Sequence, residues 1–194
     1  MSPRRRLTAL VVLSAALVVL AIAVAGGSSG SPRSVVVSKG AAAAALAGSP
    51  AALASLHAQA DLLLAGGPTV FAARLKQLRG YPIVINKWAS WCGPCQTEFP
   101  AYQRASIAYG RTVAFIGIDG KDSDASAAAF LHRFPVSYPS YVDPREAIAR
   151  SVRAAIYYPQ TVYIDRAGTE VYDHAGPYET AAALEQDIRR YVLR

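Results

Sequence analysis

The longest uninterrupted apolar stretch of the chain lies close to its N-terminus. Residues 7–25 are apolar except for Thr8 and Ser14. At a rise of about 1.5 Å per residue, a helix over this stretch spans roughly 28 Å, close to the hydrocarbon thickness of a bilayer. The pattern therefore predicts that residues 1–25 form a single transmembrane anchor or a signal peptide.

Positive charge around this stretch predicts its orientation. Residues 4–6 are all arginine, and no further Lys or Arg occurs until Arg33. Because positive flanks stay on the cytoplasmic side, we expect a single-pass protein of the cell membrane whose C-terminal domain lies outside the cytoplasm. Residues 23–25 are Ala-Val-Ala, an acceptable signal-peptidase site, so the alternative is a secreted or periplasmic protein cleaved near Ala25.

The segment that follows has a different composition. Residues 26–49 are rich in Gly, Ser and Ala with few large side chains, and we expect a flexible tether there. The folded domain is expected over residues 50–194, with a core over residues 68–194 and a helical extension before it. One predicted face of that extension carries Leu53, Leu56, Ala60, Leu63 and Leu64.

Strand and helix patterns alternate beyond this extension. The predicted strands cover residues 83–89, 113–118, 161–164 and 170–174, the last two as a hairpin. Apolar residues at helical spacing mark four predicted helices, around Phe71, Ala127, Ile148 and Leu184, and a fifth begins near Cys92. This order predicts an α/β fold with a parallel β-α-β unit.

Composition and charge narrow the classes of function. The 194 residues are 53% hydrophobic and 17% charged, as expected for one globular domain behind an export segment. The formal net charge is +7, but three of the positive charges belong to residues 4–6. The other Lys and Arg are scattered among acidic residues without a basic run, so no nucleic-acid site is predicted.

The two cysteines of the chain carry the candidate chemistry. They lie within Trp91-Cys92-Gly93-Pro94-Cys95, directly after the first predicted strand of the domain. Unpaired N–H groups and the helix dipole stabilise a thiolate at a helix N-terminus, which makes Cys92 the expected nucleophile. Cys95, one turn further on, is placed to attack the Cys92 sulfur of a mixed disulfide. Gly93 and Pro94 suit the turn and the first helical positions.

Other uses of a Cys-x-x-Cys pair fit this sequence less well. A zinc site needs two further ligands, and the histidines, His57, His132 and His174, are widely spread. A copper carrier would hold Cu(I) with the two thiolates, but the only Met is the initiator. An inert disulfide across so short a loop stabilises little. We therefore predict no metal and no bound cofactor, only a redox-active Cys92-Cys95 disulfide.

Two motifs, in this order, carry a resemblance to a known family. The first is Trp88 to Cys95 followed by Glu98-Phe99-Pro100, and the second is Tyr158-Pro159-Gln160-Thr161. Together they resemble the thioredoxin superfamily, and more narrowly its exported, often membrane-tethered TlpA-like (ResA-like) branch. The resemblance covers residues 68–194 and implies a thioredoxin-like fold. Such a fold has a central mixed sheet flanked by helices, here with an extra strand and helix that residues 137–152 can supply.

The resemblance also implies roles for individual residues. Pro159 is implied to be a cis-proline facing the dithiol, with Tyr158 offering backbone groups to an extended substrate; a trans-proline that opens the strand is the alternative. Glu98 is implied to move protons to and from the buried cysteine, and the alternative is an exposed helical glutamate. Asn86 stands where cytosolic thioredoxins carry a buried acid, and this departure moves the expected proton relay to Glu98.

Lys87 is not explained by either motif. Strand alternation places it on the same face as Ile83 and Ile85, where a charge is costly unless it is paired. We expect its stem to lie along apolar surface and its head to pair with an acid that the sequence does not identify. The alternative is that it raises the positive potential near the dithiol.

We therefore expect an extracytoplasmic thiol-disulfide oxidoreductase. The Gly-Pro between the cysteines matches reducing thioredoxins. It favours the reduction of disulfides in exported proteins, such as apocytochrome c or copper-site proteins, with electrons from a membrane donor protein. The alternatives are an oxidant that makes disulfides and a Cu(I) carrier that uses the two thiolates.

Overall fold

The computed structural model describes residues 37–193, which lie within one compact unit. The predicted anchor or signal segment, residues 1–25, and the first part of the predicted tether lie outside the described residues. Within residues 37–193, no helix has both the length and the apolar character that a membrane crossing requires.

A mixed sheet of six strands forms the centre of the fold, in the order β1-β4-β3-β2-β5-β6. The first four strands are parallel to one another, and β5 is antiparallel to both β2 and β6. The strands are β1 (Leu63–Leu64), β2 (Ile83–Trp88), β3 (Ala114–Gly120), β4 (Ser140–Asp143), β5 (Gln160–Ile164) and β6 (Glu170–Ala175). The predicted mixed α/β sheet, including the closing hairpin, is confirmed.

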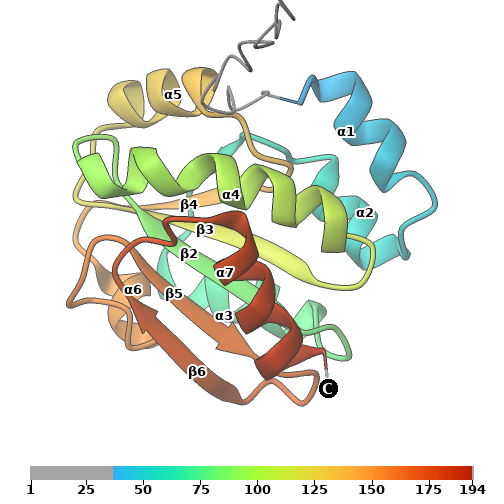
Figure 1. The fold of residues 1–194 in the computed structure, drawn as a ribbon. Coiled ribbons are helices and arrows are strands. Elements are labelled where there is room, and N and C mark those ends of the chain that lie inside the picture. The colour runs from blue at the N-terminus through green and yellow to red at the C-terminus, as the bar shows by residue number, and fades with distance from the viewer. Residues whose placement is uncertain (1–36, 194) are drawn as a thin grey trace, which may run out of the picture. The chain divides into compact units, whose positions relative to one another are not determined.

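Helices cover both faces of this sheet. Figure 1 shows α4 and α7 on one face and α3 and α6 on the other. The helices are α1 (Lys39–Leu46), α2 (Ala51–His57), α3 (Gly67–Gln77), α4 (Gly93–Tyr109), α5 (Asp124–Arg133), α6 (Ala147–Ser151), α7 (Ala181–Asp187) and the π-helical turn η1 (Ile188–Val192). Strand β4 and helix α6 occupy the segment in which the resemblance implied an extra strand and helix.

Strand β2 is buried on both faces because it lies between two apolar clusters. Val84 and Trp88 pack in the cluster that α4, α5 and α7 share, whereas Ile83 and Ile85 pack in the cluster of α2, α3 and α6. The Trp88 ring stacks on Phe130 of α5 with ring centres 4.8 Å apart. The sheet therefore holds the carboxyl end of β2, from which the cysteine loop starts, between two packed layers.

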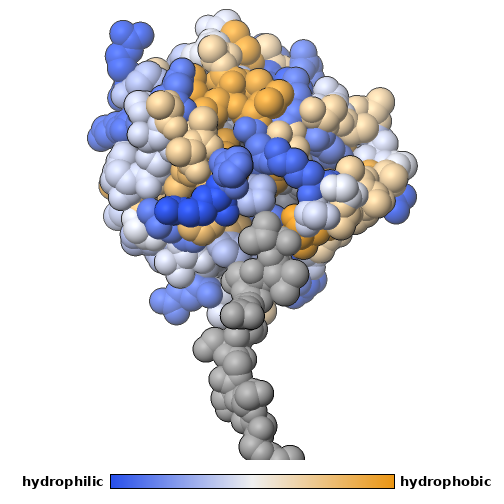
Figure 2. All heavy atoms as spheres, turned by 90° about the horizontal axis from the view of Figure 1, so that it is seen from above, coloured by the Kyte–Doolittle hydropathy of each residue, from blue (hydrophilic) through white to orange (hydrophobic). Residues whose placement is uncertain are grey.

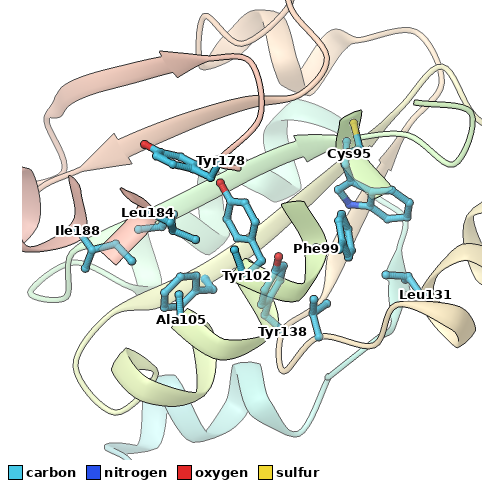
Figure 3. Close-up of a cluster of buried hydrophobic side chains, with 14 of the residues drawn as sticks. Cys95, Phe99, Tyr102, Ala105, Leu131, Tyr138, Tyr178, Leu184 and Ile188 are labelled. Atoms are coloured by element: carbon cyan, nitrogen blue, oxygen red, sulfur yellow. The ribbon is translucent and has the colours of Figure 1, made fainter. Parts of the chain in front are cut away.

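Helix α4 presents an apolar face to the sheet. Figure 3 shows Phe99, Tyr102 and Ala105 from this helix inside the core, with Tyr138 and Leu184 among the side chains around them. Cys95 lies in the same cluster, near the N-terminal end of the helix. Packing of this face fixes the end of α4 that carries the cysteine pair.

The structure differs from the expected tether at helix α1. Residues 39–46, predicted as part of a flexible segment, form a helix that begins at Ser38, whose hydroxyl accepts a hydrogen bond from the N–H of Ala41. Alanine has the highest intrinsic helix propensity, Ser38 caps the helix, and buried Leu46 packs its C-terminal end against the rest of the domain. Gly48, with φ of 75°, then turns the chain toward α2.

The helical extension is shorter than the periodicity predicted. Helix α2 ends at His57, and Leu63 and Leu64, expected on its apolar face, form β1 and pair with β4 instead. Asp61 explains the change, because its left-handed backbone (φ 61°) interrupts the helical path. Its carboxylate accepts a hydrogen bond from the N–H of Val136, which aligns the following residues with the sheet edge.

The surface mixes polar and apolar side chains. Figure 2 shows a face on which apolar side chains form separate patches between hydrophilic ones. The large apolar side chains exposed among the described residues are Leu62, Val70, Trp91, Ile156, Tyr157 and Val171. Three of these, Trp91, Ile156 and Tyr157, belong to the two loops that carry the sequence motifs.

Candidate active site

The cysteine pair lies where β2 passes into α4. Cys92 is the N-cap residue of α4 and forms a disulfide with Cys95, so the structure is the oxidised form of the couple. The N–H of Cys95 points at Cys92 Sγ, 3.1 Å away. Cys92 retains slight exposure, whereas Cys95 has none. The geometry therefore matches the predicted order, with Cys92 as the outer sulfur and Cys95 as the inner one.

The start of α4 favours negative charge on Cys92. Gly93 and Pro94 occupy the first two helical positions, as predicted, and Pro94 has no N–H to leave unpaired. The helix runs for 17 residues, and its N-terminal N–H groups and dipole stabilise an anion at the N-cap. A reduced Cys92 in this position is a better thiolate than an ordinary cysteine.

The second motif meets the first beside the dithiol. The peptide bond between Tyr158 and Pro159 is cis, as the resemblance implied, and β5 begins at the next residue. The Tyr158 ring lies 4.8 Å from the Trp91 ring, centre to centre. Trp91 is 56% exposed and its indole N–H donates to the carbonyl of Lys121. The fold thus brings Trp91 of the cysteine motif together with the loop of Tyr158 and Pro159, the predicted docking residues.

Glu98 is completely buried in α4, which excludes the interpretation as an exposed helical glutamate. Its Oε2 accepts a hydrogen bond from the N–H of Tyr178 at 3.1 Å, and its Oε1 has no hydrogen-bond partner among residues 37–193. Burial raises the pKa of Glu98 to about 8, although Tyr178 N–H and the Asn86 amide favour the carboxylate. Such an acid exchanges protons near neutral pH.

Other buried polar groups lie in the same region, and the sequence analysis did not single them out. Asp119 is buried at the end of β3, opposite Trp88 of β2, and burial together with the nearby Asp122 raises its pKa to about 8. Asp122 accepts hydrogen bonds from both the N–H and the hydroxyl of Ser90, and so holds the loop before Trp91. An acid at the carboxyl end of a parallel strand was the available signal.

Lys87 is paired with an acid, and that acid is Glu146. The Lys87 ammonium is completely buried and lies 2.9 Å from Glu146 Oε1. Burial lowers the pKa of Lys87, and the Glu146 carboxylate opposes that change. Burial also acts to raise the pKa of Glu146, but contacts with Lys121, Lys87 and Tyr158 outweigh it and lower the pKa to about 2. The expected pairing is confirmed, and the partner comes from a distant segment.

Two of the three histidines, His57 and His174, make contacts of their own. The two ring nitrogens of His57 lie 3.3 Å and 3.0 Å from the carbonyl oxygens of Ser137 and Gly110. The His174 ring stacks on the Tyr178 ring with centres 4.1 Å apart. Over residues 37–193, no group of three or more His, Cys, Asp and Glu side chains is placed to hold a metal ion.

Comparison with known proteins agrees with this arrangement. The model of the AhpC/TSA family matches residues 68–172, which is more than half of the chain. The chain is 25% identical over 117 residues to the thiol-disulfide oxidoreductase ResA of Bacillus thuringiensis subsp. konkukian, covering 60% of this chain and 66% of the relative. It is 32% identical over 101 residues to a thiol:disulfide interchange protein DsbE homolog of Paracoccus denitrificans, covering 48% and 50%.

A solved structure supports the same relationship. A putative thiol:disulfide interchange protein DsbE from Chlorobium tepidum is 27% identical, with a TM-score of 0.53, covering 60% of this chain and 83% of that structure. The chain spans about two thirds of the ResA relative and half of the DsbE homolog. The ResA relative is named a thiol-disulfide oxidoreductase and the DsbE relatives are named thiol:disulfide interchange proteins, and this chain carries the redox cysteine pair, so the predicted resemblance and enzyme class are confirmed.

Proposed function

This chain belongs to the AhpC/TSA family, and from that premise we propose that it reduces disulfides in exported proteins through Cys92 and Cys95. The observation that carries the proposal is the Cys92–Cys95 disulfide at the N-terminal end of α4, next to an exposed aromatic surface. Relatives named as thiol-disulfide oxidoreductases support the same chemistry.

The first step starts from the reduced dithiol. The Cys92 thiolate attacks one sulfur of the substrate disulfide and forms a bond with it, while the other substrate sulfur leaves as a thiolate. The N-terminal N–H groups of α4 stabilise the charge on Cys92 Sγ before the attack. The product of this step is a mixed disulfide between Cys92 and the substrate.

The second step releases the substrate. Cys95 loses its proton and attacks Cys92 Sγ, which forms the Cys92–Cys95 disulfide and expels the second substrate thiolate. Two electrons pass to the substrate in total. We assign the proton to Glu98, which follows Cys95 by one helical turn on α4 and has a pKa of about 8 because it is buried. Its carboxylate takes the proton from Cys95 and later returns it when the couple is reduced again.

The substrate docks on the loops that surround Cys92. Three large apolar side chains on these loops are exposed: Trp91 by 56%, Ile156 by 76% and Tyr157 by 51%. Ile156 and Tyr157 are adjacent in the sequence, with no charged residue between them. Together with the backbone before Pro159 they offer an apolar surface to an extended segment of an unfolded protein. The docking residues therefore recognise a chain segment rather than a defined side chain.

We place this reaction outside the cytoplasm. Residues 7–25 are apolar and follow the arginines of residues 4–6, which supports either a membrane anchor or a cleaved signal peptide. A reductant on that side of the membrane needs electrons from a membrane donor protein. Apocytochrome c and copper-site proteins are the proposed substrates, because both must present reduced cysteines outside the cytoplasm.

A trapping experiment tests the proposal. The full chain with Cys95→Ser, reduced and mixed with an oxidised peptide disulfide, is expected to accumulate a mixed disulfide at Cys92, because the second step is blocked. Cys92→Ser is the matched control and is expected to trap nothing. A mixed disulfide that accumulates only in the Cys92→Ser variant, on Cys95, would contradict the assignment. So would the absence of a mixed disulfide in both variants.

A further inference from the structure

A charged cluster lies directly behind the loop that carries Tyr158. Glu146 Oε1 lies 2.9 Å from Lys87 Nζ and accepts a hydrogen bond from the Tyr158 hydroxyl at 2.8 Å. Its Oε2 lies 2.7 Å from Lys121 Nζ. Glu146 is buried, its backbone is in the left-handed conformation (φ 54°), and it lies immediately before α6. A buried non-glycine residue in this backbone region is uncommon and is typical of functional sites.

The cluster holds Tyr158 by more than its hydroxyl. The Lys87 ammonium lies 3.7 Å from the centre of the Tyr158 ring, within the range of a cation-π interaction. The same ring contacts Trp91, whose indole N–H donates to the carbonyl of Lys121. Tyr158 is therefore connected both to the buried charges and to the exposed aromatic residue beside Cys92.

Gly120 leaves space for this arrangement. A Cβ atom at Gly120, the last residue of β3, would lie 2.2 Å from the Tyr158 hydroxyl oxygen and 3.2 Å from the ring carbon that bears it. The φ angle of Gly120 is not positive, so its backbone conformation does not itself require glycine. Glycine at this position is explained by the close approach of Tyr158.

We propose that Glu146 is a positioning residue for thiol-disulfide exchange. Held by Lys87 and Lys121, its carboxylate fixes the Tyr158 hydroxyl and, through Tyr158, the backbone before Pro159 that receives the substrate chain. The inference rests on the docking surface proposed above and adds a residue that touches neither sulfur. It predicts that Glu146 matters for a protein disulfide and not for a small disulfide that needs no docking.

The test compares two substrates in single-turnover reactions of the pre-reduced full chain. One is insulin, a protein disulfide, and the other is 2-hydroxyethyl disulfide, which is small and neutral. Glu146→Gln and Tyr158→Phe are each expected to lower the second-order rate constant for insulin about tenfold, the scale of one charge-assisted hydrogen bond. The rate constant for 2-hydroxyethyl disulfide is expected to stay within about twofold of the wild type.

A double variant shows whether Glu146 acts through Tyr158. If it does, Glu146→Gln with Tyr158→Phe loses no more activity toward insulin than the more impaired single variant. Gly120→Ala, which leaves every charge in place, is expected to show the same selective loss because its methyl group displaces the Tyr158 hydroxyl. Circular dichroism at the assay temperature confirms that each variant is folded.

A matched control comes from Glu185 of α7, which contacts the far end of α4. Glu185 accepts a hydrogen bond from the Tyr109 hydroxyl at 3.4 Å and pairs with Arg189 at 3.3 Å, so it too joins a tyrosine and a cation. Tyr109 ends the helix that starts at the cysteine pair. Glu185→Gln is expected to react with both substrates at the wild-type rate.

Three outcomes overturn the inference. They are equal losses with both substrates, no loss with insulin, and additive losses in the double variant. Failure of the proposed function has a different signature, because the reduced wild type itself then leaves insulin disulfides intact. If the wild type proves to be an oxidant, the same substrate comparison is made in the reverse direction with reduced, unfolded protein.

Discussion

The backbone N–H of Tyr178 donates a hydrogen bond to Glu98 Oε2 across 3.1 Å, inside a core that excludes solvent. This contact joins the acid of α4 to the segment before α7. One such bond stabilises the carboxylate less than burial destabilises it, so the pKa of Glu98 rises from 4.5 to about 8. Glu98 of the oxidised protein is therefore mostly protonated at neutral pH.

The first prediction concerns stability as a function of pH. Because the pKa of Glu98 is raised in the folded protein, its favourable contribution is complete below pH 4.5 and is lost as the pH rises to about 8. Glu98→Gln, which stays neutral, lacks this loss. We expect the oxidised variant to gain on the order of 2–4 kcal/mol relative to the wild type between pH 4.5 and 8.5.

Urea unfolding at several pH values measures this difference. Asp119 also has a pKa of about 8 and gives wild type and variant a pH dependence of the same sign. The difference between the two stability curves therefore reports the titration of Glu98 alone. Parallel stability curves for wild type and variant would show that Glu98 is not the titrating group.

A second prediction concerns the release step. Without the Glu98 carboxylate, Cys95 loses its proton more slowly, so Glu98→Gln is expected to slow the resolution of a mixed disulfide by about tenfold to a hundredfold at pH 7. The initial attack by Cys92 is expected to change little. Rapid acid quenching and mass spectrometry separate the two steps, and a variant slowed only in the first step would rule out the proposed role.

Substitution of Tyr178 is the matched control for Glu98→Gln, because Tyr178 contacts Glu98 only through its backbone N–H. Its hydroxyl lies 2.7 Å from the Tyr163 hydroxyl and donates to Asp187 at 2.6 Å. Tyr178→Phe is expected to lower stability by about 1–2 kcal/mol, because the buried Tyr163 hydroxyl and the partly buried Asp187 carboxylate each lose a hydrogen bond. The N–H that contacts Glu98 remains, so the pH profile of mixed-disulfide resolution is expected to stay where it is in the wild type.

The ion pair between Lys87 and Glu146 predicts an asymmetry in stability. Glu146→Gln leaves the buried Lys87 ammonium without a counter-charge, and we expect a loss of about 3 kcal/mol. Lys87→Met leaves Glu146 in contact with Lys121 and the Tyr158 hydroxyl, and is expected to change stability by less than about 1 kcal/mol. Urea unfolding at pH 7 measures both variants, and equal losses would contradict this account of the cluster.

Much of the fold was predictable because its signals are local. The β-branched run before Cys92 predicts a buried strand, and the Cys-Gly-Pro-Cys spacing predicts a helix start with two sulfurs one turn apart. The hairpin of β5 and β6 also follows from turn residues near Gly168. Edge strand β1 was not predictable, because its two leucines fit a helical face equally well and only the pairing with β4 decides between them.

The candidate site was predictable only where its residues lie within a motif. Glu98 and Pro159 follow from the resemblance, whereas the partner of Lys87 lies in a segment far along the chain. Glu146 reaches Lys87 because β4 and α6 return to the same end of the sheet, which is a property of the topology. The raised pKa of Asp119 has the same origin, since burial depends on the whole packed core.

The reduction potential of the Cys92–Cys95 couple decides whether this protein is a disulfide reductant. The full chain is equilibrated against dithiothreitol and glutathione buffers, and the fraction of disulfide is measured after acid trapping. We predict a reversible two-electron couple near the thioredoxin end of the known range, about −270 mV, as a reductant of exported proteins requires. A potential near about −120 mV would make the protein an oxidant, and a couple that does not titrate reversibly would contradict the redox function itself.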